Sequence, residues 1–122
     1  MKKSAQGIVR RTRGRGTIIN ALEGDDVVMS DIGNDVIDAG SGNDIVYAGG
    51  GNDLVIGGEG DDVVFAGLGN DVVLGGDGHD ALFGEGGNDV IFGGAGNDLV
   101  SGGDGNNVLS GDAANDPMSL AA

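Results

Sequence analysis

The amino-acid sequence predicts an all-β solenoid, a parallel β-roll, in which two short parallel sheets face each other and each coil consists of two nine-residue units (2 × 9 = 18). Three observations lead to this prediction. Glycine accounts for 28 of the 122 residues, whereas proline occurs once and cysteine is absent. A nine-residue unit repeats without insertion or deletion from Gly24 to Ala113. Within these units an aliphatic residue follows an aspartate at a fixed distance, and such self-similarity is typical of solenoids.

Each unit is expected to form a glycine-rich turn followed by a short strand. In the triplet Val63, Val64 and Phe65, the middle residue points to one side of the strand and its two neighbours point to the other. Small residues surround each triplet, so the chain reverses and two triplets close one coil. Glycine suits such turns because it adopts positive φ and permits close approach of two backbones.

The aliphatic residues in the middle of the triplets are expected to form the core, and they fall into two alternating sets. One sheet is predicted to bury Ile19, Ile37, Val55, Val73, Ile91 and Leu109. The other sheet is predicted to bury Val28, Val46, Val64, Leu82 and Val100.

The residues beside the core positions are expected to face outward. They are Val36, Ile45, Tyr47, Leu54, Ile56, Val63, Phe65, Val72, Leu74, Phe83, Val90, Phe92 and Leu99. Both outer faces are therefore predicted to be apolar, and large exposed apolar surfaces mark interaction sites. The alternative explanation is the β-sheet propensity of valine, isoleucine and phenylalanine.

Nine successive units carry an aspartate at the same step. These residues are Asp26, Asp35, Asp44, Asp53, Asp62, Asp71, Asp80, Asp89 and Asp98, and the tenth unit has Asn107 instead. Calcium prefers oxygen ligands from carboxylates and backbone carbonyls, both of which such turns supply. Turn preference alone would explain some aspartates, but not nine at one step when the preceding position is usually asparagine. We therefore predict that the nine aspartates are metal ligands.

The residue before each aspartate is expected to serve the turn and not the metal. Six units have asparagine there, which is predicted to adopt a left-handed conformation (Asn34, Asn43, Asn52, Asn70, Asn88 and Asn97). His79 occupies the same place in its unit and is expected to be an exposed turn residue.

Two stretches match the nonapeptide G-G-x-G-x-D-x-U-x letter for letter, namely GGEGDDVVF at 57–65 and GGAGNDLVS at 93–101. The chain therefore resembles the RTX family, the calcium-binding parallel β-roll repeats of secreted bacterial proteins. The resemblance covers about four-fifths of the chain. Departures are mild: Ala39, Ala48 and Ala66 replace the first glycine of the unit, and Thr17 replaces the aspartate in the unit before Gly24.

The resemblance implies that each ion lies between two turns stacked one coil apart. Carried over to this chain, it pairs Asp26 with Asp44, Asp35 with Asp53, Asp44 with Asp62, Asp53 with Asp71, Asp62 with Asp80, Asp71 with Asp89, and Asp80 with Asp98. Asp89 with Asn107 would form a weaker eighth site. About seven calcium ions would bring a charge equal in size to the net charge of −14 (7 × 2 = 14). We expect self-repulsion to expand the calcium-free chain and binding to drive folding.

Charge divides the chain into segments. All six basic residues lie within the first fifteen positions, and all twenty acidic residues follow from Glu23 onward. We therefore predict a basic N-terminal arm (1–14), a β-roll (15–113) and a C-terminal cap or tail (114–122). The arm is open to three interpretations: it binds the acidic body of another copy, it is a solvated tail, or, as a weaker option, it binds DNA or anionic lipid.

Several function classes are not expected. An enzyme is not predicted, because His79 is the only histidine, cysteine is absent, and the serines have no partners in register. Nucleic acid is not an expected partner. No apolar run has membrane-spanning length. Lys2 and Lys3 are followed by too short an apolar run for a signal peptide.

Two function classes remain. The first is an extracellular or cell-surface calcium-binding protein that assembles into a filament, layer or matrix through its apolar outer faces or the open ends of the solenoid. The second is a detached, calcium-triggered folding and secretion module of a larger toxin or exoenzyme. The resemblance also implies type I secretion, although the final residues NDPMSLAA only loosely resemble the signal for that route.

Overall fold

The computed structural model describes residues 9–11, 16–111 and 118–119, and every regular element within them is a β-strand. One sheet, here called the odd sheet, contains β1 (Val9–Arg11), β3 (Val27–Met29), β5 (Ile45–Tyr47), β7 (Val63–Leu68), β9 (Ala81–Gly86), β11 (Leu99–Ser101) and β13 (Met118–Ser119). The even sheet contains β2 (Ile18–Asn20), β4 (Val36–Asp38), β6 (Leu54–Glu59), β8 (Val72–Asp77), β10 (Val90–Phe92) and β12 (Val108–Ser110).

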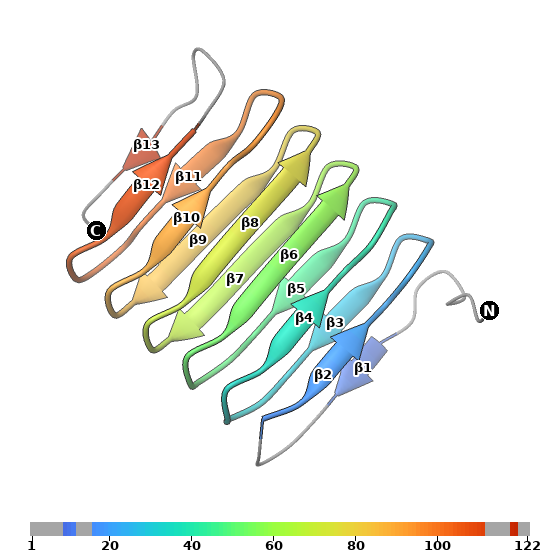
Figure 1. Ribbon diagram of the computed structural model, residues 1–122, viewed down its shortest axis with the longest axis horizontal. Coiled ribbons are helices and arrows are strands. Elements are labelled where there is room, and N and C mark those ends of the chain that lie inside the picture. The colour runs from blue at the N-terminus through green and yellow to red at the C-terminus, as the bar shows by residue number, and fades with distance from the viewer. Residues whose placement is uncertain (1–8, 12–15, 112–117, 120–122) are drawn as a thin grey trace.

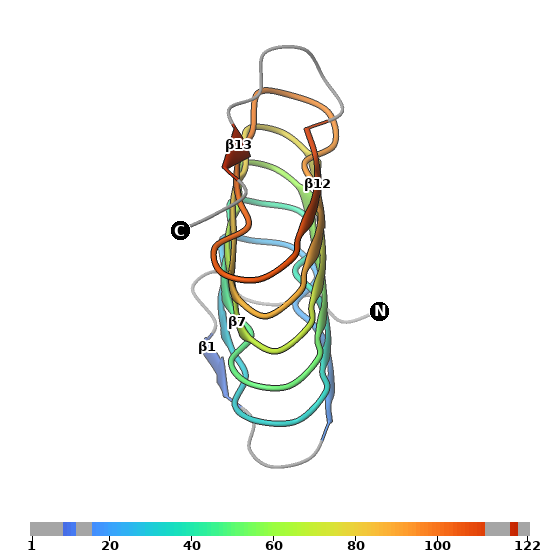
Figure 2. The same cartoon turned by 90° about the vertical axis from the view of Figure 1, so that its left-hand side faces the viewer.

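Every pair of neighbouring strands is parallel, and each strand pairs with the strand one coil away. In the odd sheet Val46 pairs with Val64, and in the even sheet Val55 pairs with Val73. Figure 1 shows the strands stacked from β1 to β13 along the roll, and Figure 2 shows the two sheets facing each other across a flattened coil. The predicted all-β solenoid, with two parallel sheets and about 18 residues per coil, is confirmed.

The core lies between the two sheets and is one side chain deep from each strand. From β2 to β11, the middle residue of each triplet is buried, whereas the residues beside it are half-buried or exposed. The predicted core residues are buried as expected, except that Leu109 is only partly buried. Buried alanines that follow the triplets, among them Ala39 after β4 and Ala66 within β7, extend the same cluster. Period-two alternation in each triplet thus positions a thin apolar layer along the roll.

The turns depend on glycine for two reasons. Gly58 and Gly60 both have positive φ, at 99° and 112°. A Cβ atom on Gly58 would also lie 1.9 Å from the carbonyl oxygen of Gly40 in the preceding coil. Only glycine combines this conformation with this approach.

The prediction that asparagines adopt left-handed conformations was wrong. In the part of the chain that the structure describes, the non-glycine residues with positive φ are Leu22 and Glu85. The glycine before each asparagine takes the positive φ instead, as Gly33 does before Asn34 with φ 108°. The asparagine side chains have another role, described below.

The odd sheet reaches into the segments that the sequence analysis assigned to the arm and the tail. β1 pairs with β3, so that Val9 lies opposite Val27, and β13 pairs with β11, so that Met118 lies opposite Val100. Each added strand keeps the step of one coil between partners and can therefore join the sheet in register. The other residues of the two terminal segments lie outside the described part.

Candidate metal centres

The turns place the nine aspartates in two rows, one along each edge of the flattened coil. Edge one consists of the turns that lead from the even sheet to the odd sheet, and it carries Asp26, Asp44, Asp62, Asp80 and Asp98. Edge two consists of the turns that lead from the odd sheet to the even sheet, and it carries Asp35, Asp53, Asp71 and Asp89, followed by Asn107. Each row thus stacks residues that are one coil apart in the sequence.

Within each row, successive aspartates are joined by hydrogen bonds, as far as Asp98 on edge one and Asp89 on edge two. The backbone N–H of Asp44 donates to Oδ1 of Asp62 at 2.8 Å on edge one, and the N–H of Asp53 donates to Oδ1 of Asp71 at 2.7 Å on edge two. All seven predicted pairs are joined in this way. At the end of edge two, Asn107 Oδ1 accepts from the N–H of Asp89 at 2.7 Å. The structure therefore brings together the residues that the sequence analysis paired.

These carboxylates are buried. Each of the nine aspartates exposes between 1% and 3% of its surface. Burial is possible because a small residue stands five positions before each aspartate, as Gly57 does for Asp62 and Ala66 for Asp71. Ser30 occupies this place before Asp35, and its hydroxyl donates a hydrogen bond to Oδ2 of Asp35.

In six of the hydrogen-bonded carboxylates, the second oxygen is left for another ligand. Oδ2 is buried and lacks a hydrogen-bond partner in Asp44, Asp53, Asp62, Asp71, Asp80 and Asp89. A buried charged oxygen without a partner is strongly unfavourable, because burial removes its water. A bound cation would remove this penalty.

The small residues also leave a cradle beside these oxygens. A Cβ atom on Gly57 would lie 2.8 Å from Oδ2 of Asp62 and 2.7 Å from the carbonyl oxygen of Gly75. A Cβ atom on Gly75 would lie 2.7 Å from Oδ2 of Asp80 and 2.6 Å from the carbonyl oxygen of Gly93. Carboxylate and carbonyl oxygens therefore converge where the side chain is missing, and this donor set fits calcium.

Burial and mutual repulsion shift the pKa values of these groups. Burial, opposed by the backbone hydrogen bond and reinforced by neighbouring carboxylates, raises the pKa of Asp62 from 3.8 to about 8. The same causes raise the pKa of Asp71 and Asp80 to about 7. The pKa values of Asp44 and Asp53 rise to about 6. Without a cation, the raised pKa values of Asp62, Asp71 and Asp80 therefore favour protonation of these three carboxyl groups near neutral pH.

Side chains alone do not complete a metal site here. Among the described residues, no group of three or more histidine, cysteine, aspartate or glutamate side chains is arranged to hold a metal ion. Each candidate centre therefore consists of two carboxylates and backbone oxygens. Such mixed oxygen sets are usual for calcium.

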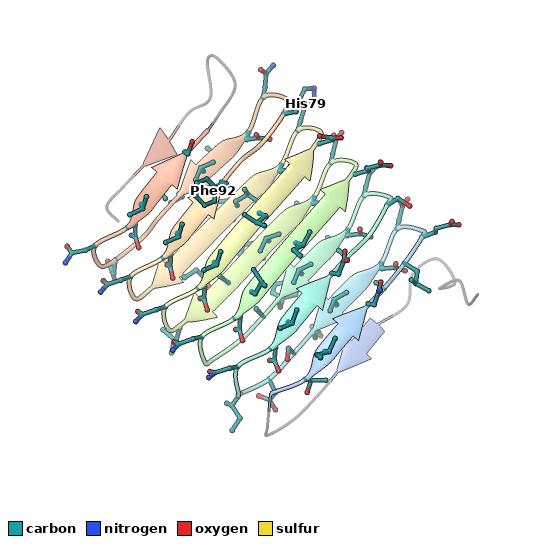
Figure 3. The ribbon with its side chains drawn as sticks, viewed as in Figure 1. His79 and Phe92 are labelled. Atoms are coloured by element: carbon teal, nitrogen blue, oxygen red, sulfur yellow. The ribbon has the colours of Figure 1, made fainter. Side chains whose placement is uncertain are left out.

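The residues before the aspartates form a second, exposed ladder that the sequence analysis missed. On edge two the N–H of Asn70 donates to Oδ1 of Asn52 at 2.8 Å. On edge one the N–H of Asn97 donates to Nδ1 of His79 at 2.9 Å, and His79 projects from its turn as Figure 3 shows. This outer ladder runs opposite to the inner one, because here the later coil donates. The recurrence of asparagine before aspartate was the available signal.

Comparison with known proteins agrees with this geometry. A family model described as the RTX calcium-binding nonapeptide repeat (4 copies) matches residues 20–55, 47–82, 56–91 and 83–116. Comparisons with curated proteins and with solved structures found no significant match. The described residues contain no helix that is long and apolar enough to cross a membrane.

Proposed function

The chain belongs to the family of RTX calcium-binding nonapeptide-repeat proteins, and from this premise we propose that it is an extracellular or cell-surface protein that folds on binding calcium and assembles with copies of itself. The assembly would be a filament, a layer or a matrix. The β-roll of this family is a structural calcium-binding unit and not a catalytic one.

The buried aspartate oxygens without hydrogen-bond partners are the observation that carries this proposal. The nine aspartates are the proposed ligands, and their seven pairs would hold about seven ions. Bound calcium would supply the positive charge that the two rows lack. Because ligand that binds the folded chain alone stabilises it by mass action, calcium would drive folding.

The proposed location follows from the affinity expected of such sites. Extracellular calcium modules bind with dissociation constants of about 10⁻⁴ to 10⁻³ M. At that affinity, calcium outside the cell would load the sites, whereas the low calcium concentration of the cytosol would leave the chain unfolded. Repeats of this family are typical of secreted proteins, and type I secretion is the proposed route.

The outer faces support self-association. The residues that flank the buried central residue of each triplet include no charged residue in β3, β5, β7, β9 and β11 of the odd sheet, and only Asp38 in the even sheet from β2 to β12. The rings of Tyr47, Phe65 and Phe83 stack along the odd sheet at centroid distances of 5.0 and 5.1 Å. Phe92 is 39% exposed on the even sheet (Figure 3). Apart from Asp38, the acidic residues between 16 and 111 therefore lie in the turns or at the strand ends beside them, as Glu59, Asp77 and Glu85 do, and the largely uncharged triplet faces suit a second copy.

The ends of the roll offer a second route to assembly. Among the described strands, β2 and β12 each pair on one side only within the even sheet. Free edges of this kind present unpaired backbone groups to another strand.

The proposal is tested by adding calcium to the calcium-free chain and recording circular dichroism, light scattering and electron micrographs. We expect a gain of β signal, reversed by a chelator, and assemblies in the loaded sample. A matched variant with Tyr47→Thr, Phe65→Thr and Phe83→Thr should fold with calcium but assemble less, because threonine keeps β propensity with less apolar surface. Folding without association in the wild type would instead favour the alternative, a calcium-triggered folding and secretion module of a larger toxin or exoenzyme. Absence of any β signal on adding calcium would refute both.

A further inference from the structure

The two edges of the roll carry the same inner row of aspartates but differ outside it. On edge one, five of the ten positions one and three residues before the aspartates are acidic, namely Glu23, Asp25, Glu59, Asp61 and Asp77, and the other five hold Ser41, Asn43, His79, Ala95 and Asn97. On edge two, the same positions before the four aspartates hold Ile32, Asn34, Gly50, Asn52, Leu68, Asn70, Gly86 and Asn88, none of which is charged. Other acidic residues near edge two occur singly, such as Asp31 in a turn and Glu85 near the end of β9.

The outer charge of edge one is densest around the pair Asp62 and Asp80. Glu59 and Asp77 are both exposed and lie opposite each other in adjacent coils. Asp61 is fixed in the outer ladder, where its Oδ1 accepts a hydrogen bond of 2.8 Å from the N–H of His79. Three carboxylates therefore surround the turns that hold this one pair.

The charge of Asp61 reaches the inner row. It is one of the charges that raise the pKa of both Asp62 and Asp80. At the corresponding place on edge two, Asn70 and Asn88 make the same ladder contact, at 2.8 Å, without a charge. Edge two has one outer charge of this kind, Glu85, which is among the charges that raise the pKa of Asp71. The two edges thus share their geometry and differ in the number of outer carboxylates near the inner pairs.

We propose that the two rows of calcium sites are unequal and that the site between Asp62 and Asp80 on edge one fills first. This inference rests on the calcium binding proposed above. The outer carboxylates do not contact the ion; they raise its local concentration through their field. For a divalent ion in water about 8 Å from one added unit charge, Coulomb's law gives roughly a fivefold change in affinity at low salt. Physiological salt reduces this effect to about twofold.

The site between Asp62 and Asp80 also lies where folding could begin. Asp62 and Asp80 precede β7 and β9, which, with β6 and β8, are the four longest strands, at six residues each. In a solenoid each coil contacts mainly its neighbours, so a coil pair fixed early becomes the template for the next. The first ion would therefore order the middle of the roll before its ends.

Two substitutions at equivalent positions test the inference. Asp61→Asn removes one outer charge from edge one, and Asn70→Asp adds one to edge two. Both residue types occur naturally at this step, and both keep the oxygen that the outer ladder needs. Calcium would be titrated by calorimetry at low and high ionic strength, while the amide resonances of Asp62 and Asp71 report on the two edges.

In the wild type we expect the Asp62 amide to respond at lower calcium than the Asp71 amide. Asp61→Asn should weaken the first binding phase about two- to fivefold, and Asn70→Asp should strengthen binding on edge two by a similar factor. High salt should reduce both effects. Circular dichroism at saturating calcium should show the same β signal in all variants, which excludes misfolding as the cause.

The results that overturn the inference are distinct from those that overturn the proposed function. The inference fails if calcium binds in one phase, if both amides respond at the same calcium concentration and if Asp61→Asn changes nothing. In that case the two rows have equal affinity, and the proposed calcium binding is retained. If no variant binds calcium at any ionic strength, the proposed function fails and this inference fails with it.

Discussion

The backbone N–H of Asp62 donates a hydrogen bond of 2.8 Å to Oδ1 of Asp80 in the next coil, while Oδ2 of Asp80 is buried without a hydrogen-bond partner. One carboxylate therefore performs two tasks. Its first oxygen joins two coils through the backbone, and its second oxygen remains available to a cation. The same division recurs in Asp44, Asp53, Asp62, Asp71 and Asp89, so the same side chains that join the coils also offer oxygens to ions.

The two tasks can be separated by mutation. Asp80→Asn keeps an oxygen that can accept from Asp62, as Asn107 does from Asp89, but removes the charge. Because Asp80 is shared by two predicted sites, we expect up to two fewer bound ions and a higher calcium midpoint for folding. Asp80→Ala should lose the hydrogen bond as well, at an additional cost of about 1–3 kcal/mol. Calcium stoichiometry by calorimetry and chemical denaturation at saturating calcium would measure the two effects. Equal behaviour of the two variants would contradict this division of tasks.

Replacing a glycine by alanine should destabilise the roll where φ is positive and a backbone atom lies close, and should have less effect elsewhere. Gly58→Ala would place a Cβ atom 1.9 Å from the carbonyl oxygen of Gly40 at φ 99°, so we expect loss of more than about 2 kcal/mol of unfolding free energy. Gly86→Ala is the control, because φ there is not positive and its nearest atom is the mobile end of the exposed Leu68 side chain. Denaturation of the calcium-loaded proteins would compare them. Similar stabilities for the two variants would show that the coils can separate to admit a side chain.

Replacing leucine by alanine should lower the unfolding free energy much more in the core than on the surface. Leu82 is fully buried and Leu68 is 71% exposed. We expect Leu82→Ala to reduce the unfolding free energy by about 2–5 kcal/mol, because it leaves a cavity in a layer that is only one side chain deep. Leu68→Ala should change it by less than about 0.5 kcal/mol. Denaturant titration of both variants at saturating calcium provides the measurement, and a small effect at Leu82 would mean that the sheets can collapse around the missing side chain.

Periodicity explains how much of this structure could be predicted. The nine-residue step, with strand alternation and two units to a coil, predicted which residue of each triplet is buried and that each strand pairs with the strand two units away. The pairing of the aspartates was carried over from the resemblance to the RTX family. Val64 and Asp62 were therefore assigned to the core and to a row without any knowledge of the turn. Periodicity does not predict the direction of the hydrogen bonds between coils. The Asp80 side chain accepts from the N–H of Asp62 in the preceding coil, whereas the Asp61 side chain accepts from the N–H of His79 in the following coil.

The remaining differences have local causes. Asparagine's tolerance of positive φ suggested a left-handed role for Asn34, but Gly33 beside it takes that conformation at no steric cost, which frees the Asn34 side chain for the outer ladder. The strands β1 and β13 lie where the charge and the repeat pattern had weakened, so only their pairing with β3 and β11 reveals them.

The raised pKa values predict that protonation of the buried aspartates stabilises the calcium-free roll, as calcium would. The pKa values of Asp62, Asp71 and Asp80 are about 8, 7 and 7 in the folded chain, compared with 3.8 for an ordinary aspartate. Between about pH 4 and pH 8 the folded state therefore binds more protons than the unfolded state, and its stability falls as pH rises. The calcium-free roll should be most stable near pH 4 and should lose that stability as pH rises through about 6 to 8.

Circular dichroism of the chelator-treated protein between pH 4 and pH 9 would measure this effect. We expect the β signal of the calcium-free chain to be larger at pH 5 than at pH 8. In the calcium titration the sign reverses, because protons compete with calcium for the same oxygens, so the midpoint should rise as the pH is lowered from 8 to 5. A chain with Asp62→Asn and Asp80→Asn provides the control, since amides keep the oxygen acceptors but cannot titrate, and its calcium-free β signal should depend less on pH. If the calcium-free wild type instead gained β structure as the pH rose, the buried carboxylates would not repel one another as the structure requires.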